Sequence, residues 1–176
     1  MQMKASVQKG FTLIELVVVI VILGILAVTA APKFLNFSSD AHKAVLKGAV
    51  GAMHSAATIY QAATIARGLT GTQTIEGIKG DNYQPWAAAS TSTGSVSAGY
   101  DTPPEIFKAA GLNTGEWRYR IHVDGTYQVI ATPAQKLSIA EPTLAQVQST
   151  SCYFNYKWND TAAGTSPTIT IVDSGC

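Results

Sequence analysis

The chain has 176 residues, a length that suits one globular domain with an appendage. Its formal net charge is +1, so it has no overall basic field with which to hold nucleic acid. Charged residues make up 13% of the sequence, and the HExxH, GxSxG and GxxxxGK[ST] patterns of metalloproteases, hydrolases and nucleotide-binding proteins do not occur.

Apolar residues are concentrated near the N-terminus. Residues 11–31 contain fourteen Phe, Leu, Ile and Val side chains in 21 positions, and their only charge is Glu15. A helix of this length rises about 32 Å, enough to cross a hydrocarbon core of roughly 30 Å. A secretory signal peptide cleaved near Ala30 is the alternative interpretation. The apolar run is longer than in such peptides and the helical pattern continues beyond it, so we expect a helix that is retained.

The helical pattern continues to about Arg67. Small and apolar residues recur there at spacings near 3.6, which predicts an amphipathic helix with a narrow buried stripe. Gly68 and Gly71 are suited to end this helix. We therefore predict one helix from Phe11 to near Arg67. The predicted stripe consists of Phe37, Ala41, Ala44, Val45, Gly48, Ala52, Ala56, Ile59 and Ala63.

The junction before the helix has a specific sequence. Gly10-Phe11-Thr12-Leu13-Ile14-Glu15, followed by an apolar run, resembles the leader cleavage site of type IV pilins and of the pseudopilins of type II secretion. The resemblance implies a leader of residues 1–10, a transmembrane and polymerisation helix of residues 11–33, and a globular head of residues 34–176. It also implies that a prepilin peptidase cuts between Gly10 and Phe11 and then N-methylates Phe11. The partners implied are this peptidase and methyltransferase, the assembly machinery of the inner membrane, and further copies of the chain in a helical filament.

Glu15 is unusual because a carboxylate near the centre of a bilayer costs on the order of 2–3 kcal/mol and needs a partner. The resemblance implies that Glu15 pairs with the amino group of Phe11, in a neighbouring subunit or in its own, and so sets the axial register of assembly. Alternatively, Glu15 lies close enough to the helix start to reach the lipid headgroups. Gly24 and Pro32 match positions where the helix of this family loosens on polymerisation. The alternative is that they only bend it.

The middle of the chain has few regular signals. Residues 69–100 are rich in Gly, Thr, Ser and Ala and are expected to form a long irregular connection. Within it, Tyr83-Gln84-Pro85-Trp86 is expected to attach the connection to the core. Residues 101–111 begin with polar residues and prolines and end with Gly111, which predicts a short helix.

Strands are predicted in the last third. Apolar and polar residues alternate in 117–123 and in 152–158, Asp124-Gly125 predicts a tight turn into a return strand at 126–131, and 168–172 is the last strand. We therefore predict an α+β protein with the type IV pilin fold that the resemblance implies. Its long N-terminal helix, hydrophobic in the first half, packs by its amphipathic half on an antiparallel sheet of about four strands.

The two cysteines, Cys152 and Cys176, are too far apart for a CxxC motif. In a chain with an export-like start they suggest one disulfide in an oxidising compartment, and two free thiols are the alternative. A C-terminal disulfide loop resembles that of type IVa pilins. Residues 19–34, together with the final Ser-Gly-Cys, look most like the pilins of mannose-sensitive haemagglutinin pili, which serve surface attachment.

These features predict the structural subunit of an extracellular type IV pilus that mediates attachment. The subunit is held in the inner membrane before assembly, and a surface or carbohydrate ligand is a further partner. A type II secretion pseudopilin is the alternative, and a secreted enzyme or binding protein is the third interpretation. No catalytic group, cofactor or metal is expected, since His42, His54 and His122 do not have the spacing of a metal site. Arg118, Arg120 and His122 share one strand face, which we expect to be solvated, with contact to DNA or an anionic surface as the alternative.

Overall fold

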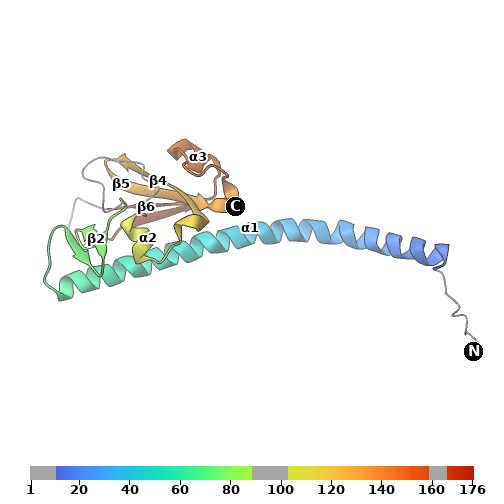
Figure 1. Cartoon of the computed structure of the whole chain (residues 1–176), viewed down its shortest axis with the longest axis horizontal. Helices are drawn as coiled ribbons and strands as arrows, with labels where there is room; N and C mark the ends of the chain where they lie inside the picture. Colours follow the sequence, from blue (N-terminus) through green and yellow to red (C-terminus); the bar gives the residue numbers. More distant parts are fainter. Residues whose placement is uncertain (1–10, 89–102, 159–165) are drawn as a thin grey trace, which may run out of the picture. The chain divides into compact units, whose positions relative to one another are not determined.

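The computed structural model describes residues 11–88, 103–158 and 166–176, and for residues 31–36 it describes the backbone only. The proposed leader, residues 1–10 with Gly10, lies outside the described residues. The chain divides into two compact units, Met1–Ser39 and Asp40–Cys176. Helix α1 (Leu13–Ala66, 54 residues) continues from the first unit into the second, which confirms the predicted long helix (Figure 1).

Helix α1 ends as its sequence predicted. Gly68 has a φ of 62°, in the left-handed region that favours glycine. The Leu69 amide donates to Thr64 O at 3.1 Å and the Gly68 amide to Ile65 O at 3.0 Å. These two bonds form a Schellman motif, which satisfies the last carbonyls of the helix.

The second unit contains the predicted four-stranded antiparallel sheet. Each strand pairs with the next in the chain, in the order β4-β5-β6-β7. Gly125, with a φ of 73°, lies between the paired residues Asp124 and Thr126, so the predicted hairpin turn is confirmed. The α+β fold class is therefore confirmed. The strands are β4 (Trp117–Asp124), β5 (Thr126–Pro133), β6 (Tyr153–Lys157) and β7 (Thr168–Val172).

The core of the second unit lies between this sheet and α1. Alternating residues of β4 are buried, and aromatic rings fill the centre. The ring centroids of Phe107 and Tyr119 are 5.2 Å apart, and those of Trp117 and Phe154 are 5.1 Å apart. The buried side chains that α1 contributes to this unit are Leu46, Ala49, Val50, Met53, Ala56, Ala57, Tyr60 and Thr64.

The predicted stripe on α1 was wrong. Of its nine residues only Ala56 is buried, while Val45 and Ile59 are 49% and 69% exposed. The prediction followed the small residues of the helix. The packing face is instead defined by the larger side chains of Leu46, Met53 and Tyr60, which recur every seven residues, two helical turns apart.

The predicted irregular connection is partly regular. Residues 73–85 form a three-stranded antiparallel sheet, and residues 89–100 lie outside the described residues. Its tight turns have positive φ at Glu76 (50°), Asn82 (49°) and Tyr83 (66°), which composition alone does not predict. The expected attachment to the core is confirmed, because Tyr156 Oη donates to Pro85 O at 2.8 Å and Gln84 is 2% exposed. The strands are β1 (Gln73–Ile75), β2 (Ile78–Asp81) and β3 (Gln84–Pro85).

The short elements complete the unit. The predicted short helix is α2 (Glu105–Ala109), but its N-cap is Pro104 and no side chain caps it among the described residues, which exclude Asp101 and Thr102. Helix α3 (Leu144–Ser149) was not predicted, although Thr143 and Gln146 form a capping box. The remaining elements are the 3-10 turns η1 (Thr114–Glu116) and η2 (Ala134–Lys136).

Candidate assembly site

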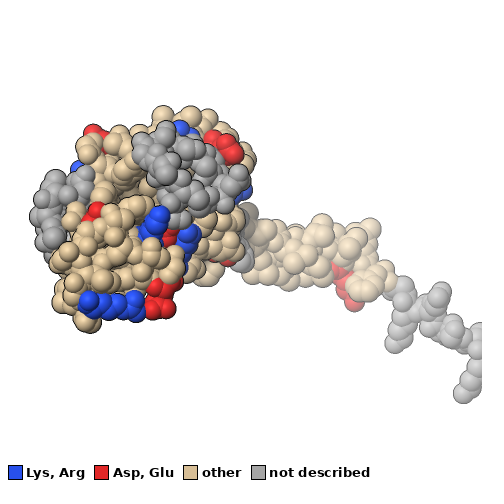
Figure 2. Space-filling view, turned by 60° about the vertical axis from the view of Figure 1, so that its left-hand side comes forward, with Lys and Arg blue, Asp and Glu red and all other residues tan. Residues whose placement is uncertain are grey.

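The N-terminal part of α1 presents an apolar surface that no other described residue of the first unit covers. Leu13–Ala30 is long and apolar enough to cross a membrane, with a mean hydropathy of 3.0, and none of it is buried. Figure 2 shows this segment as almost entirely uncharged, with an acidic patch near its start. Fully burying each large apolar side chain gains about 1.5–3 kcal/mol, so this surface is stable only against lipid or other apolar helices.

The acidic patch is the carboxylate of Glu15, the only acidic residue between Leu13 and Ser39. Its Oε2 accepts hydrogen bonds from the Thr12 amide at 2.9 Å and from the Thr12 hydroxyl at 2.6 Å. The Glu15 amide donates to Thr12 Oγ1 at 3.3 Å in return. Sequence reasoning missed Thr12, although Thr-x-x-Glu before an apolar run is the pattern of a capping box.

Phe11 and Glu15 both line one shallow depression of about 330 Å³. Its remaining lining residues, Ile14, Val18 and Val19, are apolar. A carboxylate beside such a surface attracts a cation strongly, because the surrounding medium screens little. The arrangement suits contact with a positively charged, partly apolar group.

Gly24 and Pro32 both lie within the uninterrupted α1. A Cβ at Gly24 would meet no atom of the described residues within 4 Å, so packing among those residues does not require glycine there. The Thr29 hydroxyl donates to the carbonyls of Ile25 and Leu26, at 3.3 and 3.0 Å. Loosening of the helix at Gly24 and Pro32 stays a prediction.

The predicted disulfide is present. Cys152 and Cys176 are bonded with their Cα atoms 4.8 Å apart, so the alternative of two free thiols is wrong. The end of the chain is held at two further points. The Gly175 amide donates to Ser151 O at 2.8 Å, and Lys136 Nζ donates to Gly175 O at 3.0 Å and to Cys176 O at 2.5 Å.

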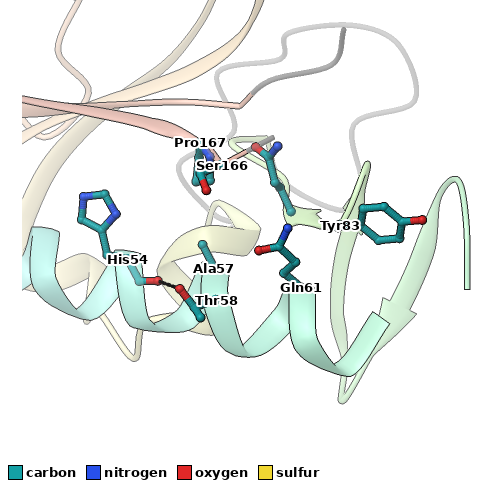
Figure 3. Close-up of a pocket in the computed structure, with 8 residues that line it drawn as sticks. His54, Ala57, Thr58, Gln61, Tyr83, Ser166 and Pro167 are labelled. Atoms are coloured by element: carbon teal, nitrogen blue, oxygen red, sulfur yellow. Dashed lines mark hydrogen bonds between the residues drawn. The ribbon is translucent and has the colours of Figure 1, made fainter. Parts of the chain in front are cut away.

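A small pocket in the second unit shows no sign of a ligand site. His54, Thr58 and Gln61 of α1 line it, together with Tyr83 of the turn after β2 and Pro167 before β7 (Figure 3). Its volume of about 30 Å³ holds about one water molecule, whereas ligand pockets have several hundred Å³. Within residues 11–88, 103–158 and 166–176, no group of three His, Cys, Asp or Glu side chains could hold a metal ion.

The basic strand face is half-buried rather than fully solvated. Arg118, Arg120 and His122 are each of intermediate exposure, and burial lowers the pKa of His122. On the face of the second unit shown in Figure 2, acidic and basic residues are interspersed among uncharged ones. That face therefore carries no extended field of one sign.

The first comparison with known proteins concerns the start of the chain. Residues 5–31 match the prokaryotic N-terminal methylation motif. This match, the apolar first half of α1 and the α+β second unit define a type IV pilin-like protein, a subunit of a pilus or of a pseudopilus.

The relatives extend the likeness along the chain. The type IV narrow pilus major component PilA5 of Thermus thermophilus is 38% identical over 99 residues, 53% of this chain and 83% of that protein. The type IV major fimbrial protein FimA of Dichelobacter nodosus is 27% identical over 128 residues, 72% of each chain. The type II secretion system core protein G of Pseudomonas aeruginosa is 42% identical over 59 residues, 34% of this chain and 42% of that protein. No solved structure matches significantly. The chain belongs to the type IV pilin family.

Proposed function

We propose that the chain is the structural subunit of an extracellular type IV pilus that attaches cells to surfaces. The proposal is carried by the likeness to two proteins named as major pilus or fimbrial components, which extends over 83% and 72% of their lengths. The likeness to the secretion protein covers only 42% of its length. The Cys152–Cys176 loop is in keeping with type IVa pilins. Residues 19–34 and the final Ser-Gly-Cys further favour a pilus of the mannose-sensitive haemagglutinin type, with a surface or carbohydrate as its ligand.

Processing precedes assembly in this proposal. A prepilin peptidase removes residues 1–10 by cutting after Gly10 and methylates Phe11, which leaves residues 11–33 as the polymerisation helix and 34–176 as the head. The inner membrane holds the subunit until the assembly machinery adds it to the filament. The continuity of α1 supports a retained helix, because cleavage near Ala30 would cut through it. The mass of the mature protein tests this: it should lack residues 1–10 and carry one extra methyl group.

Assembly depends on Glu15. Its carboxylate pairs with the Phe11 amino group of an adjacent copy and so favours one axial register, while Gly24 and Pro32 let the helix loosen as it leaves the membrane. Faster amide hydrogen exchange at residues 24–32 in filaments than in the membrane-held subunit is the expected sign of loosening.

Glu15→Gln tests the pairing because it removes the charge and nearly keeps the shape. Export and membrane levels should be unchanged, while filament yield should fall, since the amino group loses its counter-charge in apolar surroundings. The measurement is sheared surface filament per mature subunit in the membrane. Equal ratios for Glu15→Gln and wild type would contradict the pairing and leave Glu15 at the headgroups.

A type II secretion pseudopilin is the second candidate, favoured by the 42% identity to core protein G over 59 residues. The two functions differ in where the polymer forms and in what its loss prevents. Deleting the chain should abolish surface filaments and attachment if it is a pilin. If surface filaments persist and protein secretion stops, the pseudopilin function is the correct one.

A further inference from the structure

Thr12 and Glu15 close a ring of three hydrogen bonds at the start of α1. The Glu15 carboxylate uses one oxygen, Oε2, to accept both Thr12 donors. Among the described residues the other oxygen, Oε1, has no hydrogen-bond partner. The carboxylate is therefore held through Oε2, and its Oε1 is available to accept a hydrogen bond from another donor.

These hydrogen bonds also fix the Glu15 carboxylate on a surface where a second subunit can bind. A glutamate side chain normally has several rotatable bonds to immobilise when it binds a partner, and that ordering opposes association. Here the hydroxyl of Thr12 has already immobilised the carboxylate. The two donors also stabilise its charged form in apolar surroundings, since bonds to an ionised acceptor are among the stronger hydrogen bonds.

We propose that Thr12 is a positioning residue for assembly. It holds the Glu15 carboxylate through Oε2 and leaves Oε1 to accept the Phe11 amino group of a second copy of this chain. This inference rests on the proposed pairing of Glu15 with that amino group. The apolar depression lined by Ile14, Val18 and Val19 supplies a contact for the incoming Phe11 ring beside the carboxylate. Assembly then adds a bond to Glu15 without breaking those that Thr12 makes.

Two substitutions separate the hydroxyl from the shape of the side chain. Thr12→Val keeps the branched shape and removes both hydrogen bonds of the hydroxyl. Thr12→Ser keeps the hydroxyl and removes the methyl group, so it is the matched control. Each tagged variant is co-expressed with the wild type. The measurement is its incorporation ratio, which is the variant's fraction of the subunits in sheared filaments divided by its fraction of the mature subunits in the membrane. Counting mature subunits, identified by mass, excludes effects on leader cleavage, and Thr12→Ala replaces Thr12→Val if the latter is not cleaved.

We expect Thr12→Val to enter filaments about tenfold less than the wild type, the upper range of the cost of immobilising one flexible side chain on association, and Thr12→Ser to enter at parity. Because Thr12 acts through Glu15, Thr12→Val should add no further loss in a Glu15→Gln background. Parity of Thr12→Val, or an equal tenfold loss in both backgrounds, would overturn the positioning role. If Glu15→Gln itself enters at parity, the pairing in the proposed function fails as well. A reduced Glu15→Gln with a normal Thr12→Val refutes only the role of Thr12.

Discussion

Gly80→Ala tests how the small sheet of residues 73–85 is attached to α1. Gly80 lies in β2 and pairs with Gln73 on one side and Pro85 on the other. A Cβ built on Gly80 would lie 2.1 Å from Gln84 O and 2.6 Å from Tyr60 Oη, closer than real Cβ contacts. Neither neighbour can move freely, since Gln84 O is backbone at the start of β3 and Tyr60 is 4% exposed and donates to Gln73 O at 3.1 Å.

The magnitude follows from these contacts. Overpacking a tight site costs about 1–3 kcal/mol, and losing the partly buried hydrogen bond of Tyr60 costs about 1–2 kcal/mol more. We therefore expect Gly80→Ala to lower the free energy of unfolding by about 2–5 kcal/mol. Gly48→Ala is the matched control, because Gly48 is exposed within α1 and a Cβ there meets no atom within 4 Å. It should raise the free energy of unfolding by about 1 kcal/mol, the helix preference of Ala over Gly.

The assay is urea unfolding of residues 40–176 with the disulfide intact, followed by tryptophan fluorescence. If Gly80→Ala unfolds at the wild-type urea concentration, the small sheet does not pack on Tyr60 as described. If Gly48→Ala is destabilised as strongly as Gly80→Ala, the loss reflects any substitution of glycine rather than the contacts of Gly80.

Three further predictions concern the Cys152–Cys176 disulfide, the leader cleavage site and the stability of the protein at alkaline pH. Cys152→Ser should lower the free energy of unfolding by about 3.5 kcal/mol, the value expected for a disulfide that closes a loop of 25 residues. It should also reduce the number of filaments while membrane insertion stays normal. Two reactive thiols in the denatured, unreduced wild type would contradict this prediction. Gly10→Val should block leader cleavage and leave a precursor of full mass in the inner membrane, so normal filaments from this variant would refute the assigned cleavage site. Burial, and then the charges of Asp81 and Glu105, raise the pKa of Tyr60 to about 12, above the ordinary value of 10. Between pH 10 and 12 the folded state thus keeps a proton that the unfolded state loses. The free energy of unfolding should therefore be constant below pH 10 as far as Tyr60 is concerned, and should decline between pH 10 and 12. In urea unfolding, Tyr60→Phe should reduce this decline.

The long helix and the four-stranded sheet were predictable because local signals and packing agree there. The alternation from Trp117 to Val123 is long enough to reveal a strand, and Asp124-Gly125 marks its turn. The small sheet gave no such signal, since its strands have two to four residues and depend on tight turns. Tyr83, at a φ of 66°, is a residue type that normally avoids this conformation, so tertiary contacts decide it.

The packing face of α1 shows a different limit of prediction from the sequence. Apolar residues occur on two sides of this helix, so periodicity reveals an amphipathic helix without saying which side meets the sheet. The larger side chains of Leu46, Met53 and Tyr60 decide that, because aromatic residues from distant strands need partners of matching size. At the candidate site, a motif singled out Phe11 and Glu15, whose part in assembly stays a prediction. Thr12 was missed although the sequence carries its capping-box pattern, and which carboxylate oxygen it bonds is seen only in the structure.

The disulfide bond of Cys176 to Cys152 has a mechanical consequence. Strand β7 is an edge strand that pairs with β6 alone among the described strands, so a pull on its C-terminal end would load the hydrogen bonds to β6 one at a time. Here that end is tied to Cys152, directly before β6, and the main chain of Gly175 is also bonded to Ser151. A load on the C-terminal end therefore passes through the covalent tie into the chain before β6. The β6–β7 ladder is bypassed, and the edge strand cannot be unzipped from that end while the bridge is intact.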